Sequence, residues 1–256
     1  MRSLFRVANS KRNGALSLFA ALLALSGLAQ AEENTNTSGR QIEEVVVTAE
    51  RQESSVQDTS ISITAFTEGM MEDFGIRNQS DLQNLIPATV ILPYDAAIRG
   101  VGRNFRSLGG DPGISTNMNG VYSEDLYTAT IGSFWDIKRI EILRGPQGTL
   151  YGRNAIGGAM NFIYNEPTQE FEGAFKVIGG TFDTVDSYGM LSGAIVDDLL
   201  AGRLSISNRT HDGYLAEAGT GPDLDSGKER NVAAQLLLTP RDDFQVKLRY
   251  NDAQVD

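Results

Sequence analysis

Side chains able to carry out covalent or acid–base chemistry are scarce in this sequence. The chain of 256 residues contains a single histidine, His211, and no cysteine. A Ser/His/Asp set, a thiol nucleophile or a Cys/His zinc site cannot be assembled from this inventory. No pair of carboxylates stands out for acid–base work. We therefore expect that the protein is not an enzyme and has neither a cofactor nor a metal site.

The glycine-rich stretches also fail as nucleotide-binding loops. Gly152 and Gly157 have the spacing of a phosphate loop, but Gly158 and Ala159 stand where Lys and Ser or Thr are required. Residues 100–102 supply two glycines without a third in the required place. The net charge of −11 at pH 7 further opposes binding to nucleic acid. We therefore expect no nucleic-acid partner.

The stretch around which the chain is organised runs from residue 139 to 163, RIEILRGPQGTLYGRNAIGGAMNFI. It opens with a short apolar run that suits a buried strand. Recurrent glycines then favour a tightly turned segment against which other backbone can pack closely. Glu141, Arg144 and Arg153 stand where a flexible linker would carry Ser or Gly. An ordinary glycine-rich turn is the alternative interpretation.

This stretch closely resembles the plug-domain signature of TonB-dependent outer-membrane receptors. Ser80–Pro87, Ile98–Gly102 and Asn119–Tyr122 resemble further plug motifs, with Ala88 and Asn119 departing from the usual residues. The resemblance implies an α+β plug domain, a small mixed sheet with short helices, over residues 56–168. It also implies plug–barrel ion pairs, in which Arg144 and Arg153 meet acidic wall residues and Glu141 meets a wall base.

A valine-rich segment precedes this domain. Its residues have strong strand preference, yet polar segments flank it on both sides. An isolated strand on a tether is suited to addition at the edge of a partner's sheet. The segment is similar to the TonB box, which TonB grips from the periplasm. The residues concerned are Glu43, Glu44, Val45, Val46, Val47, Thr48 and Ala49. The alternative is the first strand of the following domain.

The N-terminal residues 1–31 have the pattern of a secretory signal peptide. A positively charged start precedes an apolar core and the small-residue site Ala29-Gln30-Ala31. A membrane-anchoring helix is the alternative. We interpret residues 32–55 as a periplasmic tether that contains the 43–49 segment. This tether is too short for the additional signalling domain that some of these receptors carry.

Two polar, irregular stretches interrupt the plug region. In the resembling family, such loops lie at the external end of the plug and help to hold the ligand. This comparison makes Tyr94, Arg103, Phe105 and Arg106 candidate ligand-binding residues. Plain solvated loops are the alternative.

From about residue 170 the pattern changes to strict alternation of apolar and polar residues. Such alternation is typical of transmembrane barrel strands with an apolar outer face. We expect strands at 171–179, 182–194, 200–211, 229–239 and 244–252. Residues 169–256 are therefore interpreted as the first antiparallel strands of a large transmembrane β-barrel. Because the family's barrel has about 22 strands, we expect the sequence to be C-terminally truncated.

The resemblance implies active import across the outer membrane of a Gram-negative bacterium. The partners would be TonB with its inner-membrane energising complex, outer-membrane lipid and a small-molecule ligand. A metal chelate, most often a ferric siderophore, is the expected ligand; cobalamin, haem and glycans are alternatives. A passive porin or a structural barrel is the competing hypothesis, and it needs neither the plug nor the valine-rich segment.

Overall fold

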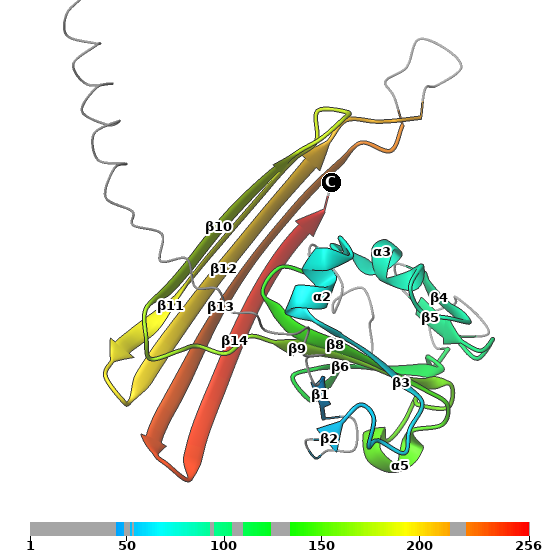
Figure 1. Cartoon of the computed structure of the whole chain (residues 1–256), viewed down its shortest axis with the longest axis horizontal. Helices are drawn as coiled ribbons and strands as arrows, with labels where there is room; N and C mark the ends of the chain where they lie inside the picture. The colour runs from blue at the N-terminus through cyan, green and yellow to red at the C-terminus, as the bar shows by residue number, and fades with distance from the viewer. Residues whose placement is uncertain are drawn as a thin grey trace, which may run out of the picture. The chain divides into compact units, whose positions relative to one another are not determined.

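The computed structural model describes residues 45–48, 52, 54–92, 95–103, 110–123, 134–215 and 224–255. The proposed signal peptide, and Glu43, Glu44 and Ala49 of the valine-rich segment, lie outside the described residues. The chain from residue 44 onward forms one compact unit. Within it, a smaller α/β domain is followed by a sheet of five long strands, β10–β14, which we call the long sheet (Figure 1).

The described residues of the α/β domain form short strands and three short helices. Its strands are β1 (Val46–Val47), β2 (Ser54–Ser55), β3 (Ile63–Thr67), β4 (Thr89–Leu92), β5 (Asp95–Ile98), β6 (Ile114–Met118), β7 (Val121–Ser123), β8 (Ile137–Arg144) and β9 (Gly158–Tyr164). Its helices are α2 (Glu68–Asp73), α3 (Gln79–Gln83) and α5 (Gly148–Tyr151). None of the helices in the described part of the chain has the length and apolar character needed to cross a bilayer.

One five-stranded sheet, in the order β3-β8-β9-β6-β7, forms the centre of this domain. Its β6–β9 pair is parallel, whereas its other pairs are antiparallel. Two separate two-stranded pieces accompany it, β1–β2 and β4–β5. The expected small mixed sheet with short helices is therefore present.

The two faces of the central sheet have different coverings, because successive side chains of a strand point to opposite faces. Ile140, Ile142 and Phe162 lie in a large apolar cluster that also includes residues of α2 and α3. On the opposite face, Leu143 packs in a smaller cluster with Val47 of β1. The valine-rich segment therefore covers the second face of the sheet.

Helix α2 begins at a residue whose side chain satisfies one of its first N–H groups. Thr67 caps α2, and its Oγ1 accepts a hydrogen bond from Met70 N at 3.3 Å. Helix α3 ends at Gln83. The Gln83 Oε1 accepts a hydrogen bond from Ile91 N at 2.6 Å, so the end of the helix is tied to β4.

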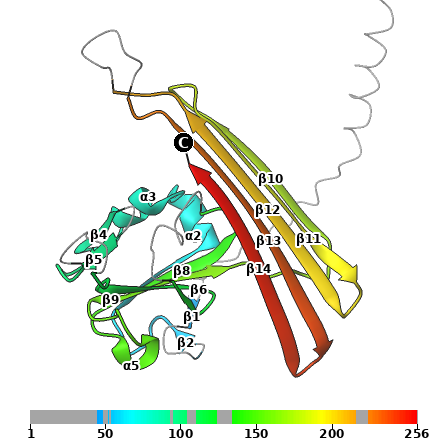
Figure 2. The same ribbon diagram turned by 180° about the vertical axis from the view of Figure 1, so that it is seen from behind.

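The long sheet is an antiparallel meander in chain order. Its strands are β10 (Glu172–Gly179), β11 (Val185–Val196), β12 (Leu200–His211), β13 (Gly227–Arg241) and β14 (Phe244–Val255). All five predicted strands are present. The second begins at Val185 instead of residue 182, because Phe182 and Asp183 have φ of 57° and 47° and form the preceding turn. Figures 1 and 2 show that these strands are much longer than those of the α/β domain.

The two faces of the long sheet differ in polarity, as the alternation predicted. One row across all five strands consists of Gly173, Leu191, Leu204, Ala234 and Tyr250. Exposed apolar side chains are common on this face. A neighbouring row on the opposite face consists of Glu172, Ser192, Arg203, Gln235 and Arg249. This polar face contacts the α/β domain through hydrogen bonds described below.

Candidate functional site

The described part of the valine-rich segment, Val45–Thr48, lies on the central sheet as a small separate hairpin. Val46 pairs with Ser55, and Val56 N donates to the Val45 carbonyl at 3.0 Å. Val47 is fully buried against the sheet. The segment is therefore held on the domain without being a strand of the five-stranded sheet.

A row of polar side chains crosses the sheet beneath this segment. The strand registers place Glu141, Asn161 and Asn117 side by side on β8, β9 and β6. All three side chains are buried. Burying a carboxylate costs free energy unless it is paired and hydrogen-bonded. The row must therefore be satisfied by donors from its surroundings.

The valine-rich segment supplies two of the donors to Glu141. The Glu141 Oε1 atom accepts hydrogen bonds from Thr48 N at 2.8 Å and from Thr48 Oγ1 at 3.2 Å. Arg139 Nε donates to the same oxygen at 2.8 Å, and Arg139 Nη2 donates to Thr48 Oγ1 at 3.0 Å. Asn161 Nδ2 donates to Oε2 at 3.1 Å. Glu141, Arg139 and Thr48 therefore bond to one another in a closed set.

The glycine-rich turn between β8 and β9 also contacts this polar row. Asn161 Nδ2 donates to the Tyr151 hydroxyl at 2.7 Å, and Asn117 Nδ2 donates to Asn161 Oδ1 at 3.2 Å. Tyr151 ends the short helix α5, which lies between β8 and β9. The glycine-rich turn therefore positions a hydroxyl that fixes the amide beside Glu141.

Glycine is required where this turn enters β9. A Cβ placed on Gly158 would lie 2.2 Å from the Leu143 carbonyl oxygen, so no larger residue fits without a shift of the backbone. The turn is closed by backbone hydrogen bonds from Gly145 N to Gly157 O and from Gln147 N to Ala155 O. The repeated glycines of the signature thus serve close packing of backbone on backbone.

A buried ion pair joins the α/β domain to the long sheet. Arg203 Nε lies 3.0 Å from both carboxylate oxygens of Asp136, and Arg203 Nη2 donates to Asp136 Oδ1. Both side chains are almost fully buried. Arg203 Nη1 also donates to the Glu166 carbonyl at 3.3 Å, and Asn165 Nδ2 donates to Asp136 Oδ1 at 3.2 Å. This geometry satisfies both members of the pair.

Asp136 reaches this position through an unusual backbone. It lies in a turn before β8 with φ of 64°, a value that few residues other than glycine adopt. The next residue, Ile137, is already the first residue of β8. The neighbouring Trp135 donates from Nε1 to the Gly189 carbonyl at 3.1 Å and lies 5.1 Å from the Tyr188 ring.

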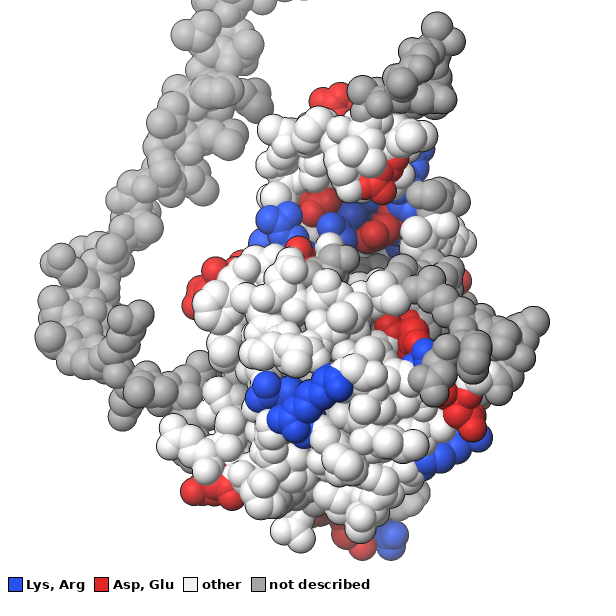
Figure 3. Space-filling view, turned by 90° about the vertical axis from the view of Figure 1, so that its right-hand side faces the viewer, with Lys and Arg blue, Asp and Glu red and all other residues white. Residues whose placement is uncertain are grey.

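A second charged cluster surrounds Asp186 on β11. Arg77 Nη1 and Arg209 Nε each lie 3.5 Å from Asp186 Oδ2, and the Tyr188 hydroxyl donates to the same oxygen at 3.2 Å. Arg209 Nη1 also donates to Glu229 at 2.8 Å. Figure 3 shows charges of both signs close together between the domain and the strands. The interface is therefore polar and complementary in charge.

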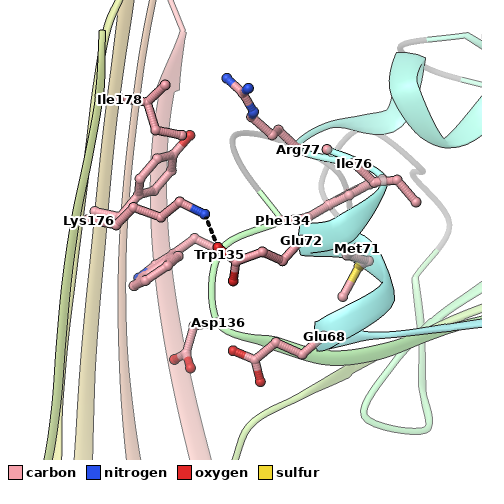
Figure 4. Close-up of a pocket in the computed structure, with 12 residues that line it drawn as sticks. Glu68, Met71, Glu72, Ile76, Arg77, Phe134, Trp135, Asp136, Lys176 and Ile178 are labelled. Carbon is pink, nitrogen blue, oxygen red and sulfur yellow. Dashed lines mark hydrogen bonds and ion pairs between the residues drawn. The ribbon is translucent and has the colours of Figure 1, made fainter. Parts of the chain in front are cut away.

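A cavity of about 130 Å³ lies beside this interface (Figure 4). It is bordered by α2 and by residues of β10 and β11. Figure 4 shows Lys176 reaching Glu72 across it, with a distance of 2.5 Å between Nζ and Oε1. Charged side chains thus bridge the domain and the strands at this point too.

Tyr164 at the end of β9 forms a further contact with the long sheet. The Arg249 guanidinium lies 3.6 Å from the centre of its ring. Burial raises the pKa of the Tyr164 phenol above its ordinary value, and the charge of Arg249 opposes that shift. The phenol therefore stays protonated at neutral pH.

The structure places the predicted plug–barrel residues as follows. Among the described residues, the bonds of Glu141 go to neighbours in the α/β domain, and no wall base contacts it. The buried Nε of Arg144 has no hydrogen-bond partner in the described part of the chain. Arg153 lies over the Tyr122 ring, 5.2 Å from its centre. The predicted pairing of these three with a barrel wall stays a prediction.

Of the candidate ligand residues, Tyr94, Phe105 and Arg106 lie outside the described residues. The backbone N–H of Arg103 donates to Asp95 Oδ2 at 3.2 Å. The Arg103 Nε is buried and has no hydrogen-bond partner among the described residues. A ligand-binding role for these four residues stays a prediction.

Sequence reasoning missed the Asp136–Arg203 pair. Asp136 stands between Trp135 and Ile137, and no local pattern marks it. Arg203 follows the inward polar phase of its strand, so the alternation gives its face but not its partner. It likewise missed that Thr48 and Glu141, 93 residues apart, would contact each other.

Residues 55–159 match the family model of the TonB-dependent receptor plug domain. The chain belongs to the TonB-dependent receptors: it carries their plug domain, followed by antiparallel strands of the same fold. Membership of this family assigns it to the outer membrane of a Gram-negative bacterium and to receptors rather than enzymes. From here on we call the α/β domain the plug.

Relatives and solved structures agree with this assignment. The chain is 32% identical over 231 residues to the pesticin receptor of Yersinia pestis, covering 86% of this chain and 33% of the relative. It is 29% identical over 170 residues to the ferripyoverdine receptor of Pseudomonas aeruginosa, covering 64% of this chain and 20% of the relative.

Among solved structures, the ferric yersiniabactin uptake receptor FyuA from Yersinia pestis is similar with a TM-score of 0.66. The two sequences are 27% identical, and the match covers 76% of this chain and 32% of that receptor. The chain thus spans about a third of the length of the pesticin receptor and of FyuA.

Proposed function

We propose that this chain takes part in TonB-dependent active import of a ferric siderophore across the outer membrane. Two relatives support the choice of ligand, since one is named a ferripyoverdine receptor and the other a ferric yersiniabactin uptake receptor. The absence of a nucleotide loop from the sequence agrees with an energy source outside the chain, which TonB and its inner-membrane complex would supply.

In this proposal the long sheet is the first part of a barrel wall, and the plug blocks its lumen. The apolar face of the long sheet would meet lipid, and the polar face would line the lumen. The outer strands β10 and β14 would pair with further strands, because a free sheet edge exposes unpaired backbone groups. Arg144, with its buried unpartnered Nε, would find an acidic partner on that wall.

The observation that carries the proposal is the placement of Val45–Thr48. This segment pairs only with β2 among the described strands, and it is not part of the five-stranded sheet. Its removal would therefore leave the hydrogen bonds of the central sheet intact. A strand that can leave its domain without disrupting the central sheet is suited to addition at the edge of a TonB sheet.

The test is a proline substitution in the segment. Val46→Pro removes a backbone N–H that strand pairing needs, whereas Val46→Ala keeps it. We expect Val46→Pro to abolish uptake of the siderophore while its binding to cells persists, and Val46→Ala to retain uptake. Radiolabelled ferric siderophore measures both quantities on the same cells.

The competing hypothesis of a passive porin predicts the opposite result for uptake. Uptake would then continue when the proton gradient is collapsed, and Val46→Pro would leave it unchanged. Either result would refute energised import. Ferric siderophore that neither binds to nor enters cells would instead refute only the choice of ligand.

A further inference from the structure

We propose that Glu141 is a positioning residue that latches the Val45–Thr48 segment to the plug until TonB draws the segment off. The inference rests on the proposed function, and it assigns to one buried carboxylate the control of when the segment becomes available. It thereby gives Glu141 a role distinct from the wall pairing that the sequence implied.

The first support is the origin of the bonds to Glu141. The side chain is 0% exposed, yet two of its hydrogen bonds come from Thr48, outside the five-stranded sheet. Both donors of Thr48, the backbone N–H and the hydroxyl, meet the same oxygen. A carboxylate that served only the sheet would have no need of donors from a separate hairpin.

The second support is that Glu141 has donors that do not belong to the segment. When the segment leaves, Arg139 Nε and Asn161 Nδ2 still donate to Glu141, so its charge keeps its partners. Departure also uncovers this face of the sheet, so water can replace the Thr48 donors. Release therefore avoids an unpaired buried charge, which would otherwise hold the segment permanently.

The third support is the position of Thr48 relative to Val47. Val47 packs in the apolar cluster that includes Leu143 and Ala159, but apolar contact alone specifies no register. The two hydrogen bonds of Thr48 to Glu141 fix the register of the segment on the sheet. The polar latch and the apolar contact thus act on adjacent residues. Release of the segment must therefore break the hydrogen bonds of Thr48 and the apolar contacts of Val47 together.

A cysteine reporter can measure release, because the plug contains no cysteine of its own that would compete for the label. In Val47→Cys the thiol is buried when the segment is latched and reacts with a maleimide only when the segment opens. The labelling rate is then proportional to the open population. The receptor is labelled in outer membranes without siderophore, and the reporter is combined with Glu141→Gln.

Glu141→Gln keeps the size of the side chain but removes its charge. We expect the labelling rate at position 47 to rise roughly tenfold to hundredfold, since hydrogen bonds to a charged group are lost. The matched control is Glu72→Gln on α2, whose side chain is exposed and bonds to Lys176. We expect this control to leave the rate unchanged.

A second reporter separates unlatching from general loosening of the plug. Ala96→Cys places the thiol in the main apolar cluster, remote from the segment. Labelling that rises at 47 and not at 96 supports the latch, whereas an unchanged rate at 47 overturns it. If Glu141→Gln raises the labelling rate at both positions, the same measurement on Thr48→Val tests the latch. A selective rise at 47 in that variant supports the latch, and no rise overturns it.

Binding of the isolated periplasmic domain of TonB distinguishes this inference from the proposed function. We expect Glu141→Gln to increase its affinity for ligand-free receptor roughly tenfold, because more of the segment is available. TonB that fails to bind either form while position 47 is labelled faster would refute the proposed function alone. Tight TonB binding with position 47 equally protected in both forms would overturn the latch alone.

Discussion

Two buried side chains of opposite charge meet between the plug and the long sheet. Asp136 and Arg203 come from different parts of the fold and exclude water from their contact. Such a pair adds little stability over apolar residues of the same shape, but losing one member leaves an uncompensated charge. Its main effect is therefore to fix one position of the plug against the long sheet.

At the residue scale, we predict that Arg203→Met destabilises the plug against the strands by about 3–5 kcal/mol. The reason is that Asp136 keeps only Asn165 of the side-chain donors described above. Urea titration, followed by the fluorescence of Trp135, measures the effect, because Trp135 contacts Tyr188 on β11.

Lys247→Met is the comparison for that prediction. Lys247 pairs with Glu166 between the same two parts of the chain, but both side chains are about half exposed. Its loss should cost no more than about 1 kcal/mol. Equal costs for the two substitutions would show that burial does not decide the strength of these contacts.

At the scale of elements, the glycine-rich turn links several parts of the plug. It returns the chain from β8 to β9, places Tyr151 beside Asn161, and packs backbone against β6 through Gly157 N and Gly113 O. The turn and the polar row are thus one assembly. A change in the turn should therefore affect the segment that the row holds.

We predict that Gly158→Ala destabilises the plug by about 3 kcal/mol or more, since an added Cβ would overlap the Leu143 carbonyl. Gly75→Ala is the matched control: Gly75 also has positive φ, but nothing lies within 4 Å of the added atom. That control should cost only about 1 kcal/mol. Thermal unfolding of purified receptor measures both, and equal costs would contradict the steric argument.

At the scale of the whole molecule, the two faces of the long sheet have the reverse of the arrangement found in a soluble protein. Its exposed face carries large apolar side chains, and the face toward the plug carries charged and polar ones. In water such a face would drive association, whereas in lipid it is the favoured surface. The polar face in turn lets the plug be held by hydrogen bonds and ion pairs.

We predict that Leu248→Lys on the apolar face reduces the stability of the inserted receptor by about 2–4 kcal/mol if it lies at the bilayer midplane. Asn251→Lys, on the opposite face of the same strand, should have a much smaller effect. Folding into lipid vesicles, measured by heat-modifiable migration on gels, compares them. An equal loss in both variants would argue against a lipid-facing surface.

Local pattern was sufficient for much of this fold. The period of two in residues 171–252 predicted all five long strands and their polar and apolar faces, because side-chain direction in a strand depends only on sequence position. Turn details were less accessible: Phe182 and Asp183 adopt left-handed backbone although neither is glycine. The Gln83 side chain at the end of α3 bonds to a strand eight residues later, a contact that no local pattern indicates.

The sequence by itself determined the family, the strand pattern and the valine-rich segment, since each of these depends on the pattern of residues close together in the chain. Only the tertiary structure decided the partners of the buried charges. Glu141 meets Thr48 across 93 residues and Arg203 meets Asp136 across 67, and no local periodicity encodes such distances. The physical reason is that a buried charge takes whatever donors or acceptors the packed chain brings within hydrogen-bond reach.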